Sequence, residues 1–312
     1  MPGTEGAQPP DETRAMEASA AAAPPPHGEA APASAAPAAP DDANDLRGYH
    51  FKRLMGAGRT WALIAIPALL VGGVIAGAGA PAIGGIAFVL AILIGIAICF
   101  AIADRRAADA FFSLYASKHD LALGGRAALP PSTPLLRRGD DRYAERTLTG
   151  QLARDCGGML ALYTYEEEHT DGDGNRETNY HRYTVGLTTV QECASHVPEL
   201  YCQRKLGLHA LEKLEDVFRR SKERVKLESA ALDDKYEIFS AKGQDANWLR
   251  QLFEPSFIVW LTDSAPPKFA FELVDGTLCC YLSGHEEDGA GLDAISIATA
   301  TVARRLREES TE

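Results

Sequence analysis

The segment TWALIAIPALLVGGVIAGAGAPAIGGIAFVLAILIGIAICFAIA, from Thr60 to Ala103, contains no Asp, Glu, Lys, Arg or His. One helix crosses a bilayer with about 20 apolar residues, so this uncharged run is about twice as long as one crossing requires. Pro81 follows a stretch rich in Gly and Ala and interrupts the run, because proline has no backbone N–H to donate. The sequence therefore predicts two transmembrane helices, residues 60–78 and 82–103, joined by a short uncharged turn.

The charges that flank this run predict its orientation. Short segments rich in Lys and Arg stay on the cytoplasmic side of a membrane. We therefore expect the uncharged turn to cross, with both termini in the cytoplasm and the lipid bilayer as the partner of the run. The flanking cations are Arg47, Lys52, Arg53 and Arg59 before the first helix, and Arg105, Arg106, Lys118 and Arg126 after the second.

Small residues recur every four positions in both predicted spans, and this spacing lets helix backbones approach closely. Two interpretations are open: the two helices of one hairpin pack on each other, or this face associates with a second chain. Neither span contains an ionisable acid or base, which argues against an ion or proton path. The small residues are Gly73 and Gly77 in the first span, and Ala87, Ala91, Gly95, Cys99 and Ala103 in the second.

The first 45 residues contain no Val, Ile, Leu, Phe, Tyr or Trp and are dominated by Ala, Pro, Gly and acidic residues. Such a segment has too little apolar surface to offset the entropy lost on ordering, so we expect a disordered tail over residues 1–45. Its eight acidic residues, against a single arginine, carry most of the formal charge of −12. The remainder of the chain is only mildly acidic, which argues against a nucleic-acid partner.

The rest of the chain divides by composition. Residues 46–59 read as a basic juxtamembrane segment, and residues 104–121 as an amphipathic helix that continues the second span. Its Phe112 and Tyr115 are expected either to touch lipid headgroups or to pack against the following domain. Residues 122–142 contain several prolines and read as a linker. Residues 143–312 are expected to form a cytosolic domain.

Strand and helix patterns in residues 143–312 predict an α+β domain with a mainly antiparallel sheet and packed helices. A β-hairpin is expected with its tip at residues 171–175, and a second hairpin turns at Asp275-Gly276, a strong turn signal. Pro255 suits the first position of a helix. The predicted strands are residues 159–167, 179–190, 223–228, 235–240, 268–274 and 277–282; the predicted helices are residues 210–221, 245–253, 255–261 and 291–308.

Residues 225–261 and 269–282 resemble a family of bacterial membrane proteins of unknown function. That family carries two amino-terminal transmembrane helices and a cytosolic α+β domain, and the resemblance implies the same architecture here. The tail and residues 142–196 depart from the family pattern, and the family implies no activity. The matching positions are Leu227-Glu228-Ser229, Tyr236, Phe239, residues 246–252, Pro255-Ser256-Phe257 and Asp275-Gly276.

Candidate metal sites are weak in this sequence. The acidic segment from His169 to Glu177, with Asp171, Asp173 and Asn175, lacks the Gly and Glu that a helix-loop-helix calcium loop requires, because Arg176 and Arg182 stand there. Asp and Gly also suit a tight turn, so we interpret the segment as a hairpin tip. The six cysteines form no Cys-x-x-Cys pair, and we expect them to be reduced and largely buried. They are Cys99, Cys156, Cys193, Cys202, Cys279 and Cys280.

Catalytic motifs are equally weak. The chain has no Gly-x-Ser-x-Gly elbow, and Ser283-Gly284-His285 follows a strand without that frame. Gly56-Ala57-Gly58 does not follow a strand, so it is no nucleotide fingerprint. His181 is expected to share a strand face with Tyr183, and a lone strand histidine is usually structural. We assign no catalytic, cofactor-binding or metal residue.

Three functional hypotheses follow. The leading one is a non-enzymatic anchored module that displays the domain to a protein partner or to a second copy. The alternative is a membrane-tethered hydrolase that uses His169, His181 and Cys193. The third is a protein that binds anionic lipid or shapes membranes through Phe111-Phe112 and a basic run of Arg219, Arg220, Lys222, Arg224 and Lys226. We interpret that run itself as a solvated helix end followed by an edge strand.

Overall fold

The computed structural model describes residues 43–170, 172, 174–205 and 222–311. The predicted tail lies outside these residues, except for residues 43–45, and so does the predicted helix 210–221. The described helices are α1 (Ala43–Met55), α2 (Gly58–Gly77), α3 (Pro81–Lys118), α4 (Pro134–Arg137), α6 (Ala230–Lys235), α7 (Ala246–Leu252), α8 (Pro255–Val259) and α9 (Gly289–Thr311), with shorter turns at Gln191–Cys193 and Trp260–Ser264.

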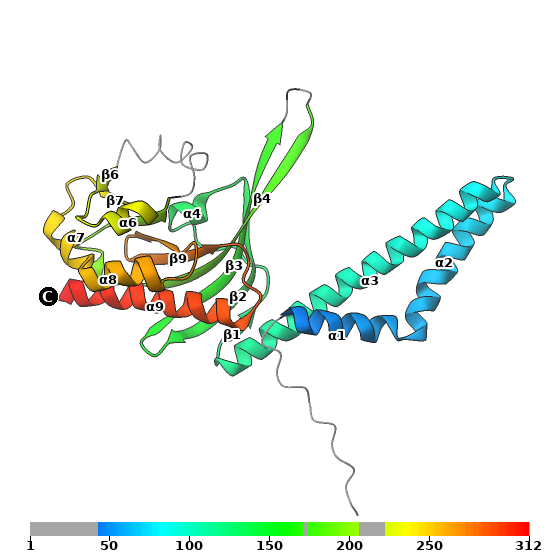
Figure 1. The fold of residues 1–312 in the computed structure, drawn as a ribbon, viewed down its shortest axis with the longest axis horizontal. Helices are drawn as coiled ribbons and strands as arrows, with labels where there is room; N and C mark the ends of the chain where they lie inside the picture. Colours follow the sequence, from blue (N-terminus) through cyan, green and yellow to red (C-terminus); the bar gives the residue numbers. More distant parts are fainter. Residues whose placement is uncertain (1–42, 171, 173, 206–221, 312) are drawn as a thin grey trace, which may run out of the picture. The chain divides into compact units, whose positions relative to one another are not determined.

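The domain is built on one antiparallel sheet in the order β1-β2-β3-β4-β9-β8-β5-β7-β6 (Figure 1). The predicted α+β class with a mainly antiparallel sheet is therefore confirmed. The strands are β1 (Ala122–Gly124), β2 (Asp141–Ala153), β3 (Cys156–Thr170), β4 (Arg176–Thr189), β5 (Glu199–Arg204), β6 (Lys222–Val225), β7 (Tyr236–Ala241), β8 (Ala270–Val274) and β9 (Thr277–Ser283).

Both predicted hairpins are present. Thr170 of β3 pairs with Arg176 of β4, so these two strands form the predicted hairpin, although Asp171 and Asp173 of its expected tip lie outside the described residues. Asp275 and Gly276 join β8 to β9 with φ values of 46° and 72°. Positive φ at both central residues matches the twist of the two strands, which explains why Asp-Gly is favoured there.

The two faces of the sheet bury separate cores, as the adjacent residues Cys279 and Cys280 illustrate. Successive side chains of a strand point to opposite faces. Cys280 lies in the larger core, between the sheet and the helices α3, α7, α8 and α9. Cys279 lies in the smaller core on the other face, with Tyr163 and Val185. The domain therefore has helices over one face and a different cover over the other.

That other cover comes from the segment predicted as a linker, residues 122–142. Its first residues form β1, which pairs with β2, and Leu135 and Leu136 of α4 are buried in the smaller core. The interpretation as a linker is therefore incomplete. Its prolines do end regular structure, but its leucines close the second face of the sheet.

The helices α2 and α3 are long and apolar enough to cross a membrane. Only 17% and 11% of their most apolar windows are buried, which is the reverse of a core helix in a soluble protein. Pro81 occupies the first turn of α3, where a missing N–H costs nothing. The predicted continuation of the second span is confirmed, because α3 runs without a break from Pro81 to Lys118.

The hairpin packs on itself. On α3 the contact includes Gly95 of the predicted small-residue row, which meets Ile64, but on α2 it lies on a different face from Gly73 and Gly77. An added Cβ at Gly84 would lie 2.7 Å from the Gly72 carbonyl oxygen, so these two backbones touch. An added Cβ at Gly73 or Gly77 would meet nothing within 4 Å. The sequence shows the four-residue spacing correctly, but which small residues face the partner helix depends on the rotation of α2, which packing sets.

A cross-link tests this packing. An ideal Cβ at Gly95 lies 3.3 Å from the Ile64 Cβ, close to the separation in a disulfide. We expect Ile64→Cys with Gly95→Cys, in a Cys99→Ala background, to form an intramolecular disulfide on oxidation. A protease site inserted after Gly79 lets a non-reducing gel detect the linked halves. A disulfide that forms only between two chains, as a dimer through this face requires, contradicts the self-packed hairpin.

Among the described elements, three strands (β1, β2 and β5) and three helices (α1, α4 and α6) were not predicted. In β2 a bulge between Ala144 and Arg146 breaks the alternation that marks a strand in sequence. β5 is a short central strand whose four middle residues are all buried, so it shows no alternation either. β1 is too short to leave a pattern. α1 occupies the segment predicted only as basic and juxtamembrane, and the helix α6 follows Ser229, whose hydroxyl accepts the Leu232 N–H at 3.3 Å.

Candidate functional site

The candidate site among the described residues is the place where α3 enters the domain, which we call the junction. It consists of α1, residues 103–119 of α3, β2 and the start of α9. Ala103, Ala107 and Phe111 recur at four-residue spacing on α3 and are all buried, at 0%, 0% and 2% exposure. The same helix that forms the second apolar span therefore continues directly into the core of the domain.

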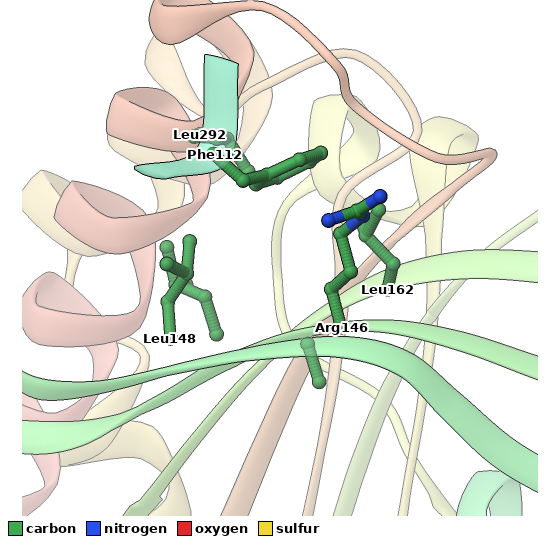
Figure 2. A pocket seen from close by; sticks show the side chains of 7 residues that line it. Phe112, Arg146, Leu148, Leu162 and Leu292 are labelled. Atoms are coloured by element: carbon green, nitrogen blue, oxygen red, sulfur yellow. The ribbon is translucent and has the colours of Figure 1, made fainter. Parts of the chain in front are cut away.

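Phe112 is the centre of the junction. Its ring is fully buried among Leu148, Leu162 and Leu292, and the Arg146 guanidinium lies over it at 5.1 Å from the ring centroid (Figure 2). The Arg146 Nη2 also binds the Asp109 Oδ1 of α3 at 2.7 Å. The space between these side chains is too small for a water molecule, so this is a packing contact and no ligand pocket.

α1 holds α3 from the other side. Its half-buried face packs along α3, and the rings of Phe51 and Phe100 meet edge to face at 5.7 Å. Arg47 forms an ion pair with Asp104 of α3 and lies 3.4 Å from Glu287, in the loop before α9. α1 therefore connects the helical hairpin to the sheet domain through Arg47, whose two acidic partners are far from it in the sequence.

The last turn of α3 is bound to α9. The Tyr115 hydroxyl donates a hydrogen bond of 2.7 Å to the Asp293 Oδ1, and burial raises the pKa of this tyrosine, which keeps it a donor. His119 stacks on the Tyr115 ring at 4.2 Å and places its Nε2 3.5 Å from the same carboxylate. These contacts fix the end of α3 rather than present groups to a substrate.

A buried carboxylate holds the cover of the second face. Glu272 of β8 is 1% exposed, and its Oε2 accepts the Leu135 N–H at the start of α4, 2.9 Å away. Burial raises the pKa of Glu272, while the Leu135 N–H and the nearby Arg138 charge oppose that rise. Glu272 is therefore a latch between β8 and α4, enclosed from solvent.

The structure separates Cys193 from the two histidines of the hydrolase hypothesis. His181 stacks on Tyr165 at 4.6 Å and shares its strand face with Tyr183, as predicted, while Cys193 lies in the larger core on the opposite face. Eight residues of extended strand, about 26 Å, lie between His181 and the end of β4 near Cys193. His169 lies on the same strand face as His181, and their Nε2 atoms are 3.8 Å and 3.5 Å from the same Glu167 Oε2, far from Cys193. These three side chains form no common site.

The cysteines and His285 are equally unsuited to attack a substrate. All six cysteines are free and buried. Burial raises the pKa of Cys193 to about 11, which keeps it a thiol at neutral pH. Burial also lowers the pKa of His285. Its Nε2 lies 3.3 Å from the Thr164 Oγ1, but Thr164 is only 1% exposed, so a substrate cannot reach this hydroxyl.

The residues proposed to bind a metal ion or anionic lipid are next. Among the described residues, no group of three His, Cys, Asp or Glu side chains is placed to hold a metal ion; Asp171 and Asp173 of the hairpin tip lie outside them. In the basic run, Arg219 and Arg220 also lie outside. Lys222 pairs with Glu199 and Arg224 with Glu237 on the edge strand β6, whereas Lys226 follows that strand and is exposed. Phe111 and Phe112 are buried.

Sequence reasoning missed the junction because its contacts are long-range. Arg47 and Glu287 are 240 residues apart, and no spacing rule joins them. One signal was available in the sequence. Phe111, Phe112 and Tyr115 follow the apolar span in the same helical register, which indicates that the helix continues and buries these side chains against the domain. Packing against the domain, one of the two outcomes expected for Phe112 and Tyr115, is confirmed.

Comparisons with known proteins add one likeness. No protein-family model matches the chain. A search of curated proteins returns no match either. Among solved structures, the chain is similar to the crystal structure of the mycobacterial trehalose monomycolate transport factor A, TtfA, at 10% sequence identity and a TM-score of 0.42; the match covers 65% of this chain and 94% of that one. A likeness at these values carries no argument on function.

Proposed function

We propose that this protein crosses a membrane twice, keeps both termini in the cytoplasm, and holds its α+β domain against the inner membrane surface to bind a protein partner. The observation that carries the proposal is the unbroken α3, which is apolar and exposed in its first half and buried in the domain core in its second half. An anchor joined by a flexible linker has no such helix.

The length of α3 supports a position close to the membrane. Ala103 ends the uncharged run, and Phe111 is the first large side chain of α3 in the domain core. Eight residues of helix span about 12 Å, which is enough to cross the headgroup layer of one leaflet, about 5–8 Å thick, and to place the core of the domain just beyond it. The domain is thereby held at the surface, where a partner that is itself in the membrane is within reach.

The topology is testable with cysteine labelling, because the six native cysteines are buried and give little background. We expect Ala78→Cys, in the turn between the spans, to react with a membrane-impermeant maleimide in intact cells. Arg250→Cys, on the exposed side of α7, is expected to react only after lysis. Labelling of Arg250→Cys in intact cells, with Ala78→Cys protected, contradicts the proposed orientation.

Partner binding has a natural test position. Beyond Glu166 and Tyr183 the strands β3 and β4 pair only with each other, and this ribbon projects past the sheet with Tyr180 55% exposed (Figure 1). A photo-reactive residue in place of Tyr180 in the full-length protein is expected to cross-link a reproducible protein. Recovery of abundant bystanders alone, identical to those from a control at the exposed Arg250 of α7, counts against a protein-binding role.

A further inference from the structure

We infer that α1 and the ends of the two spans form a binding surface for anionic phospholipid headgroups, built from five exposed cations that have no acidic partner among the described residues. The inference rests on the proposed crossing of the membrane. It concerns a surface different from the basic run at Arg219 to Lys226. The five residues, which we call the cationic band, are Lys52, Arg53, Arg59, Arg105 and Arg106, and all are exposed.

The helix packing places three cations of the band at one level and the other two within about 9 Å of it. α2 and α3 run antiparallel, and Ile64 lies against Gly95. Arg59 is five residues before Ile64, so it lies level with Phe100, which is five residues after Gly95. Phe51 of α1 contacts the ring of Phe100 and brings the next two residues, Lys52 and Arg53, to the same height. Arg105 and Arg106 lie about 8–9 Å further along α3.

This level corresponds to the headgroups of one leaflet. From Pro81 at the turn to Phe100, α3 rises about 29 Å, which matches the hydrocarbon thickness of about 30 Å. Two exposed aromatic side chains, Tyr49 at 57% and Trp61 at 44%, flank the band. Tyr and Trp gather where hydrocarbon meets headgroups, because their rings are apolar and their polar atoms remain hydrated.

The charges of the band are available. Among the described residues, the acids nearest to it in the sequence are neutralised by other cations: Asp104 by Arg47 and Asp109 by Arg146. None of the five band cations has a carboxylate partner in the described part of the chain. A row of unpaired cations beside an apolar span attracts the phosphates of anionic lipids.

Native mass spectrometry of the full-length protein, released from nanodiscs of equal parts phosphatidylglycerol and phosphatidylcholine, tests the inference. Wild-type protein is expected to retain phosphatidylglycerol over phosphatidylcholine by about fivefold or more, the effect of about one surface cation. The variant K52Q/R53Q/R105Q/R106Q is expected to lose this preference. The charge-conserving K52R/R53K/R105K/R106K is expected to keep it, which separates lost charge from lost folding.

The matched control R154Q/K205Q/R250Q/K268Q removes the same charge from the exposed surface of the domain, and we expect it to keep the preference. The inference is overturned by a wild type without preference, by a band variant that retains it, or by a control that loses it equally. Both leaflets of the nanodisc have the same lipids and no protein partner is present. The result therefore stands apart from the proposed orientation and from partner binding.

Discussion

Replacing Phe112 by alanine is expected to lower the free energy of unfolding of the full-length protein by about 3–5 kcal/mol, the usual cost of removing a fully buried aromatic ring. The ring is 0% exposed and fills the contact between α3, the sheet and α9. The Arg146 guanidinium also loses the ring beneath it. Chemical denaturation in nanodiscs, followed by tryptophan fluorescence, measures the change, since Trp248 and Trp260 pack in the same core.

Leu114→Ala is the matched control, because Leu114 lies two residues further along the same helix but is 40% exposed. We expect it to cost less than about 1 kcal/mol. The Phe112→Ala variant is further expected to become sensitive to proteases between α3 and β2, because α3 no longer holds the domain. Equal effects of the two substitutions contradict the role of Phe112 as the centre of the junction.

Replacing Glu272 by alanine is expected to destabilise the protein by about 2–4 kcal/mol, because the Leu135 N–H loses its acceptor in a buried site and a cavity remains. Glu272→Gln is the control, since its amide oxygen still accepts that N–H and it carries no charge to desolvate. We expect it to be close to wild type at neutral pH or more stable. A Gln variant as unstable as the Ala variant contradicts the latch between β8 and α4.

The pH dependence of Glu272 follows from the direction of its shift. Burial raises its folded-state pKa above the ordinary value of 4.5, so the folded protein binds the proton more tightly than the unfolded one. Its contribution to stability is fully present below pH 4.5 and is lost as the pH rises through the folded-state pKa. Comparing the free energy of unfolding of the wild type with that of Glu272→Gln over this pH range isolates the contribution of the carboxyl group. If the wild type gains stability relative to the variant as the pH rises, the raised pKa is contradicted.

The parts of the fold that sequence predicts are those with a local physical cause. The uncharged run, Pro81, Pro255 and Asp275-Gly276 each constrain the backbone where they stand, and the structure follows them. The bulged strand β2 and the short buried strand β5 lack such a signal, because their stability comes from neighbouring strands.

The candidate site was hidden for the same reason. The junction joins residue 47 to residue 287 and residue 115 to residue 293, and only the completed sheet brings them together. The rotation of α2, which turns Gly72 rather than Gly73 toward α3, is likewise set by tertiary packing. The sequence could indicate that small residues line a helix contact, but the phase of that contact required the structure.

Hydrogen exchange of the full-length protein in nanodiscs tests the central claim most directly, because it reads each backbone hydrogen bond of α3. The account predicts slow exchange without interruption from Phe100 to Ala116, across the point where the apolar span ends at Ala103. The exposed loop at Gly125 provides the fast-exchanging reference. Rapid exchange confined to residues 104–110, between two protected segments, would show that the hairpin and the domain are joined by a flexible hinge and would contradict the account.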